Sequence, residues 1–191
     1  MSFPRTIIVA ILGFISLRYI NQQQYGTSFI VDFFWIFILI CDILLTIFVI
    51  FKDVQGYKTS KKLSSFLLTL VCICITITAF LLNHSVKKEL NRPVLMELYF
   101  NGDINGICIG LRSDGTYIYE SVFLVGSDIS YGRYKTTDST ITLDPPFKGS
   151  KIDYHSFKLM PTANGIQASP IDKNNNILSP YYNFNIIDHR K

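Results

Sequence analysis

Residues 28–51 form an almost unbroken apolar stretch, SFIVDFFWIFILICDILLTIFVIF, which every other part of the chain has to accommodate. The stretch is longer than the ~20 apolar residues that a helix needs to cross a bilayer. The sequence therefore predicts a membrane protein. Two acids, Asp32 and Asp42, lie within the stretch. Because an ionised carboxylate in hydrocarbon costs at least ~2.5–3.5 kcal/mol, we expect Asp42 to face protein, water or a partner, or to be neutral.

Two further apolar stretches lie on either side of this one. Residues 6–17, TIIVAILGFISL, are bounded by Arg5 and Arg18 and are short enough to suit a signal-peptide core or an interfacial segment as well. We interpret residues 6–20 as a thin transmembrane helix, because Arg18 can snorkel and no small-residue cleavage site follows. Residues 63–82 predict a third span. The membrane region is therefore expected at residues 1–82, with helices at about 6–20, 28–51 and 63–82 and a turn at Gly56.

Two interpretations of Asp42 stay open. In the first, its charge acts in pore formation, proton movement or assembly, since acids inside a membrane are often functional. In the second, its carboxyl is hydrogen-bonded to a serine or threonine of the third span. Asp32, near the end of its stretch, is more simply an interfacial residue.

Positive charge does not choose a side of the membrane. The lysines between the second and third spans favour the inside by the positive-inside rule. A nearly equal number of basic residues flanks the other ends of the spans, at Arg18, Lys87, Lys88 and Arg92. If residues 6–20 do not cross, both termini share one side. The side that the C-terminal domain faces therefore stays open.

The residue pattern changes after a charged linker predicted at residues 83–93. Ile107, Ile109 and Leu111 alternate with other residue types, as in a half-buried strand. Turn signals, among them residues 126–128, then recur at intervals of roughly 8–12 residues. We expect strands at residues 94–100, 107–112, 116–124, 129–135, 140–143, 152–160, 165–168 and 181–187. Closure would remove the unpaired edges of so short a sheet. Residues 94–191 are therefore predicted to form a small antiparallel up-and-down barrel of about eight strands, lipocalin-like in architecture.

Residues with catalytic potential are scattered. His84, His155 and His189 have no nucleophile or carboxylate at motif spacing, and no metal-ligand spacing occurs. Cys108 is the lone cysteine of the C-terminal half and cannot form an internal disulfide. We expect a protein without enzymatic activity, cofactor or metal. The charge of this half is close to balanced, which argues against binding of duplex nucleic acid.

Tyrosines spread over several of the expected strands, and some have arginines nearby. Tyrosine offers a stacking face and a hydroxyl, and arginine binds phosphate through two N–H groups, so both at a barrel mouth would suit a planar anionic ligand. The candidate ligand residues are Arg112, Tyr117, Tyr119, Tyr131 and Arg133. The alternative is that these tyrosines are strand formers that cap a core.

Apolar N-terminal helices, a short charged linker and a helix-free barrel in 191 residues together resemble a known architecture. The chain looks like the transmembrane β-barrel effectors of bacterial cyclic-oligonucleotide antiviral (CBASS) systems. The resemblance implies a cytosolic barrel that senses a cyclic nucleotide, and helices that assemble and disrupt the inner membrane. It covers the full length but is one of architecture, so it assigns no role to a residue, and the expected third span departs from the family pattern.

The leading hypothesis is a membrane-anchored, non-enzymatic sensor and effector of antiviral defence in the bacterial inner membrane. Its barrel would bind a cyclic nucleotide, and the chain would form a homo-oligomer in which Asp32 and Asp42 mark contacts between helices. The alternative is a periplasm-facing, membrane-anchored binding or immunity-type module that recognises a protein or lipid partner.

Overall fold

The computed structural model describes residues 3–102, 104–149, 151–162, 165–178 and 182–190, with the backbone alone at residues 3, 4, 27, 29–32 and 65. The chain divides into two compact units. One is helical and consists of Met1–Gln24 and Phe29–Asn91. The other is a β unit made of Arg92–Lys191 together with Tyr25–Ser28.

The helical unit contains α1 (Phe3–Gln23), α2 (Phe29–Ser60), a short 3₁₀ helix (Leu63–Phe66) and α3 (Leu67–Leu90). Two helices are long and apolar enough to cross a membrane, α2 over Phe33–Ser60 and α3 over Leu67–Leu90. Among the described residues, α1 does not meet this criterion. The large apolar side chains of α2 and α3 are mostly exposed.

Two boundaries of the helices differ from those predicted. The expected turn at Gly56 is wrong, because α2 continues to Ser60 and the chain turns at Lys61, which adopts a φ of 57°. A single glycine costs only about 1 kcal/mol inside a helix, which its neighbours can offset. Most of the expected linker at residues 83–93 is also helical, because α3 continues to Leu90. The helix ends shortly before Pro93, which disfavours helical backbone at the preceding residue.

A small core joins the three long helices. Val9 of α1, Val49 of α2 and Leu68 of α3 are buried together, with Cys72 beside them. Gly13 allows the close approach of α1, since a Cβ there would lie 2.8 Å from the Cδ1 of Ile75 on α3. Small residues at such crossings allow helices to pack closely in lipid.

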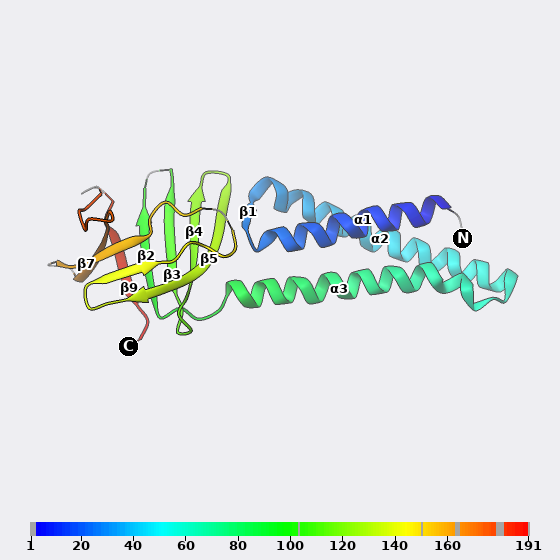
Figure 1. Ribbon diagram of the computed structural model, residues 1–191. Helices are drawn as coiled ribbons and strands as arrows, with labels where there is room; N and C mark the ends of the chain where they lie inside the picture. The colour runs from blue at the N-terminus through cyan, green and yellow to red at the C-terminus, as the bar shows by residue number, and fades with distance from the viewer. Residues whose placement is uncertain (1–2, 103, 150, 163–164, 179–181, 191) are drawn as a thin grey trace. The chain divides into compact units, whose positions relative to one another are not determined.

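The β unit is a closed antiparallel barrel, as predicted. Within the described residues, its eight strands are β2 (Met96–Asn101), β3 (Gly106–Leu111), β4 (Thr116–Phe123), β5 (Gly126–Thr136), β6 (Thr140–Leu143), β7 (Ser156–Thr162), β8 (Gly165–Pro170) and β9 (Phe184–Asp188). Each strand pairs with its neighbours in sequence, and the β2–β9 pairing closes the ring. Figure 1 shows the last strand, β9, lying beside the green β2. The prediction of an up-and-down barrel is confirmed.

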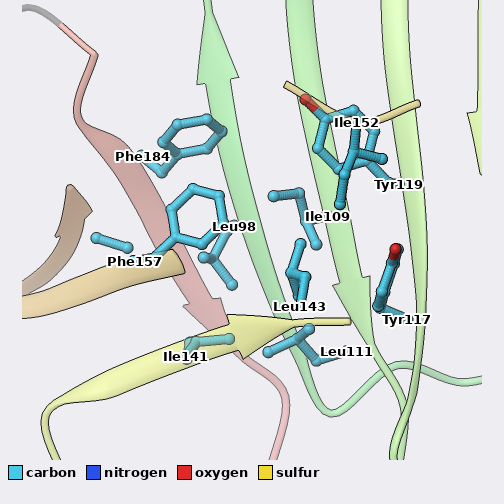
Figure 2. Close-up of a cluster of buried hydrophobic side chains, with 11 residues drawn as sticks. Leu98, Ile109, Leu111, Tyr117, Tyr119, Ile141, Leu143, Ile152, Phe157 and Phe184 are labelled. Carbon is cyan, nitrogen blue, oxygen red and sulfur yellow. The ribbon is translucent and has the colours of Figure 1, made fainter. Parts of the chain in front are cut away.

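The barrel interior is a packed hydrophobic core. Inward-facing residues alternate along each strand, and Figure 2 shows the largest of them converging from different strands. Phe157 and Phe184 meet edge to face with ring centroids 5.1 Å apart. Tyr117 lies over Gly132 of β5, where a Cβ would come within 2.4 Å of the tyrosine ring. The lumen is therefore filled by side chains over most of its length.

A ninth strand comes from the segment that precedes α2. β1 (Gly26–Ser28) pairs antiparallel with residues 126–128 of β5, and the Ile129 N–H donates to the Tyr25 carbonyl at 2.8 Å. Gly26 has a φ of 153°, and a Cβ there would lie 2.2 Å from the Ser127 carbonyl oxygen. From sequence alone, residues 21–27, NQQQYGT, indicate only a short polar link, because three residues are too few to show an alternating pattern.

The β4–β5 turn and the start of β7 also differ from the predictions. The turn signal at residues 126–128 is wrong, because the two turn residues are Leu124 and Val125 and Gly126 already pairs with Phe123. Ile152 was expected in a strand, but it lies in the long β6–β7 loop and is buried in the barrel core. The expected strand at residues 181–187 begins at Phe184, and Tyr181 lies outside the described residues.

We predict that Gly26→Ala separates β1 from β5, because the new Cβ would clash with the β5 backbone. Each ladder hydrogen bond contributes about 0.5–1.5 kcal/mol. Loss of the short ladder should therefore accelerate hydrogen exchange at the Ile129 amide by about tenfold or more. The control is Gly165→Ala, where φ is also positive but a Cβ meets no described atom within 4 Å. Unchanged exchange at Ile129 in the Gly26 variant would contradict the prediction.

Candidate functional site

Asp42 lies in the interior of the helical unit and has a partner on α1. The Ser16 hydroxyl donates a short hydrogen bond to its Oδ2. One of the two interpretations from the sequence gave Asp42 a donor from the third apolar stretch, whereas the structure supplies one from the first, because α1 packs into the bundle. Asp42 also borders a small void between Thr46 and Thr76. Asp32 lies in α2, and its side chain is outside the described part of the structure.

Asp53, a second acid of the helical unit, was not predicted from the sequence as a candidate residue. Only 7 % of its surface is exposed, and its Oδ2 accepts hydrogen bonds from the N–H (3.1 Å) and the hydroxyl (2.8 Å) of Thr69. The Nη1 of Arg5 lies 3.9 Å from its other oxygen. Thr69 is in the first turn of α3, where backbone N–H groups lack helical partners and attract negative charge. Asp53 therefore anchors the start of α3.

The five predicted ligand residues do not form one site. Tyr117 and Tyr119 point into the barrel and belong to its core. Tyr131 and Arg133 alternate with the inward-facing Gly132, so they lie on the outer face of β5. Arg112 follows β3 and approaches Tyr131. The sequence showed that Tyr131 and Arg133 share a face, but assigning that face required the pairing of Tyr117 with Gly132.

The two inward-facing tyrosines are structural. The Tyr117 hydroxyl donates to the Asp144 carbonyl at 3.0 Å, and burial raises the pKa of Tyr117 to about 12. The Tyr119 hydroxyl oxygen is fully buried near the Asp153 backbone, and burial raises the pKa of Tyr119 as well. Both phenols therefore remain protonated at neutral pH.

Outside the barrel, two cations gather around Tyr131. The Arg112 guanidinium carbon lies 5.9 Å from the centroid of the Tyr131 ring, and only 2 % of Arg112 is exposed. Lys148 Nζ lies 5.5 Å from the same centroid and 5.2 Å from that of Tyr25. We call Tyr25, Arg112, Tyr131 and Lys148 the outer cluster. Arg133, on the same face of β5 as Tyr131, is exposed.

A pocket of about 510 Å³ opens at one end of the barrel, beside the β2–β3 and β4–β5 hairpins. We call it the mouth pocket. Its apolar and aromatic lining is formed by Phe100, Ile104, Ile107, Phe123, Tyr154 and Tyr182. The rings support one another, since Tyr182 lies 5.1 Å from Phe100 and 6.1 Å from Tyr154 between centroids.

The chemistry of the mouth pocket differs from that predicted for an anion site. Asp153 is the only charged residue among its described lining residues, which also include the polar side chains of Asn105 and Ser121. Aromatic walls of this size suit a planar or apolar molecule, and a carboxylate favours a hydrogen-bond donor over a phosphate. The sequence signal for this pocket was the alternation of apolar residues at the ends of β2 and β4. The strand register was needed to show that these ends lie at the same end of the barrel.

Cys108 lies on the outer face of the barrel beside two acids. It pairs across β3–β4 with Glu120, and Glu97 is also near. Burial, with a smaller contribution from the two carboxylates, raises the pKa of the Cys108 thiol to about 11. The thiol is therefore protonated and weakly nucleophilic at neutral pH. Among the described residues, no group of three or more His, Cys, Asp or Glu side chains is arranged to hold a metal ion.

The chain matches no protein-family model, no curated protein and no solved structure.

We predict that the barrel loses stability at alkaline pH partly through Tyr117. Its pKa of about 12 in the folded chain exceeds the ordinary value near 10. The raised pKa of Tyr117 therefore stabilises the folded state fully below pH 10. This contribution to the free energy of unfolding falls by up to about 1.4 kcal/mol per pH unit as the pH rises from 10 towards 12. Tyr117→Phe should flatten this decline when unfolding free energy is followed by circular dichroism between pH 8 and 11. Tyr99→Phe, an exposed tyrosine of β2, is the matched control. An equally steep decline in the Tyr117 variant would contradict the assignment.

Proposed function

We propose that this chain is a membrane-anchored, non-enzymatic binding protein. In this proposal α2 and α3 cross the bilayer, and the barrel holds a small molecule in its mouth pocket. The mouth pocket is the observation that carries the proposal, because it is the place where the otherwise filled lumen offers space for a ligand. The protonated state of the Cys108 thiol is consistent with a binding role rather than nucleophilic catalysis.

The pairing of β1 with β5 supports two crossings. β1 immediately precedes α2, and the barrel follows α3. If both helices cross, the chain returns to the side on which it started, so β1 and the barrel occupy one compartment. The ladder between Gly26–Ser28 and β5 requires that arrangement. The Lys61 turn then lies on the opposite side. This result holds whether or not α1 also crosses the membrane. Crossing by α1 would decide only on which side the N-terminus lies.

The lining of the mouth pocket indicates the class of ligand. Phe100, Tyr154 and Tyr182 can stack on a planar apolar body, while Asp153 can accept a hydrogen bond from it. A neutral aromatic molecule with a hydroxyl or amine group fits both features. A phosphate would face a carboxylate without a cation among the described lining residues, which is unfavourable.

We predict that 2-naphthol, a neutral probe with these features, binds the mouth pocket of the full chain in lipid nanodiscs. Isoleucine methyl NMR should show shifts at the pocket residues Ile104 and Ile107, but not at Ile187 on β9, outside the described pocket lining. Tyr182→Ala removes a stacking ring worth about 0.5–1.5 kcal/mol and should weaken binding by several-fold to tenfold. Tyr99→Ala, on the outer face of the same barrel, should leave the affinity unchanged. Equal shifts at all isoleucines would show nonspecific partitioning and contradict the proposal.

A second candidate function is sensing of a cyclic nucleotide, followed by oligomerisation and disruption of the inner membrane in antiviral defence. The observation that favours it is the outer cluster, which combines two cations with two tyrosine rings. Lys148 can contact a phosphate, and the partly exposed Tyr25 ring can stack on a base, while the buried Arg112 adds positive charge beneath them. This candidate moves the nucleotide from the barrel mouth, where the sequence suggested it, to the outer face. It also requires a cytosolic barrel.

This candidate predicts that a cyclic dinucleotide binds the full chain and that Lys148→Ala weakens the binding about tenfold or more by removing a charge-assisted contact. Lys158→Ala, an exposed lysine of β7, is the control. Cells that express the chain should leak when the nucleotide is supplied, and Asp42→Ala should reduce the leakage. A reporter fused after Lys191 that is active only outside the cytosol would eliminate the candidate.

A further inference from the structure

The β4–β5 hairpin has an apolar tip. Leu124 and Val125 occupy the two turn positions and are 86 % and 50 % exposed. Two-residue hairpin turns normally carry glycine, asparagine or aspartate, because these residues adopt the required backbone and tolerate water. At the opposite end of the barrel, the described turns follow this rule with Asp114 and Gly115 and with Asp138 and Ser139. The β4–β5 tip is therefore an exception to ordinary turn chemistry.

A second exposed apolar side chain lies at the same end of the barrel, in a β2–β3 turn whose other residues are glycine or polar. Ile104, between β2 and β3, is 70 % exposed. The strand register brings the two tips to one end, because Ile107 pairs with Ser121 across β3–β4 and Phe123 pairs with Gly126 across β4–β5. We call Ile104, Leu124 and Val125 the apolar rim. The rim borders the mouth pocket, whose lining includes Ile104 and Phe123.

The chain itself connects this end of the barrel to the apolar part of α2. Gly126, next to Val125, pairs with Ser28 of β1. Ser28 is followed directly by α2, whose apolar segment begins at Phe33. Only residues 29–32 therefore separate the β1–β5 ladder from the apolar segment of α2 along the chain.

We propose that the apolar rim inserts into the interface of the bilayer that α2 crosses, and that the mouth pocket takes an apolar or amphipathic ligand from the lipid phase. The inference rests on the proposed role of the mouth pocket and adds the source of its ligand. Apolar side chains that insert into a membrane interface are removed from water, which is favourable. This would explain why apolar residues occupy the β4–β5 turn. The aromatic lining of the pocket then continues the apolar environment of the rim.

The test uses full chains that each contain one tryptophan. Trp35→Phe removes the native tryptophan, and its stacking partner Tyr19 keeps an aromatic neighbour. Leu124→Trp then places the probe on the rim, and Ser139→Trp places it at the polar turn of the opposite end. Both variants are reconstituted in nanodiscs of phosphatidylcholine, with or without bromine on the acyl chains near the headgroup.

Tryptophan at position 124 should emit at shorter wavelength than at position 139 and lose about half or more of its fluorescence in brominated discs, because tryptophan in an interface contacts the upper acyl chains. Tryptophan at position 139 should be unaffected by bromine. Emission from position 124 that resembles water-exposed tryptophan would overturn the proposal. So would emission that is shielded from water but insensitive to bromine, which would indicate that a second copy covers the rim.

The 2-naphthol titration in the same discs separates this inference from the proposed function. Probe binding at Ile107 together with an unquenched tryptophan at position 124 would refute membrane insertion of the rim and leave the binding function intact. Loss of probe binding together with a quenched tryptophan would refute the pocket and leave only a membrane-docking surface.

Discussion

The ladder between β1 and β5 is the contact that relates the two halves of the chain. Three residues that precede α2 hydrogen-bond to the barrel that follows α3. Because a ladder forms only between segments in one compartment, the proposal that both apolar helices cross the membrane agrees with this contact, since the chain then returns to the side on which it started. Gly26 is the residue that permits this contact, since any side chain there would collide with the β5 backbone. A local steric requirement at one glycine thus restricts the topology of the whole chain.

Hydrophobic periodicity was enough to predict the class of fold. The change from continuous apolar stretches to alternation at Ile107, Ile109 and Leu111 marks the change from long apolar helices to the strands of the barrel. Turn residues were weaker guides, as Gly56 and Gly126 show. Gly56 lies inside a helix, and Gly126 opens a strand, because the actual turn at Leu124 and Val125 uses residues that turn rules exclude. Rules derived for water-exposed turns therefore missed a turn formed by two apolar residues.

The candidate sites required information that single strands do not contain. Tyr117 and Tyr131 look alike in sequence, yet one fills the barrel and the other lies outside it, because strand register decides which face each occupies. Asp42 illustrates the same limit for helices, since its donor Ser16 lies on a helix whose packing the sequence does not encode as a pattern. Asp53 could not be predicted in the same way, because it accepts a hydrogen bond from the backbone at the start of α3. No side-chain motif in the sequence indicates such a contact.

Electrostatics separates the two candidate ligands. The mouth pocket offers Asp153 and aromatic rings, while the cations of the outer cluster are on the other face of the sheet wall. An anion in the mouth pocket would lie near a carboxylate, and a neutral apolar molecule in the outer cluster would displace the water that hydrates Lys148 without replacing its hydrogen bonds. Each site therefore favours one class and disfavours the other. A neutral, lipid-soluble ligand is the class that agrees with the mouth pocket and with the exposed apolar side chains of Ile104, Leu124 and Val125 beside it.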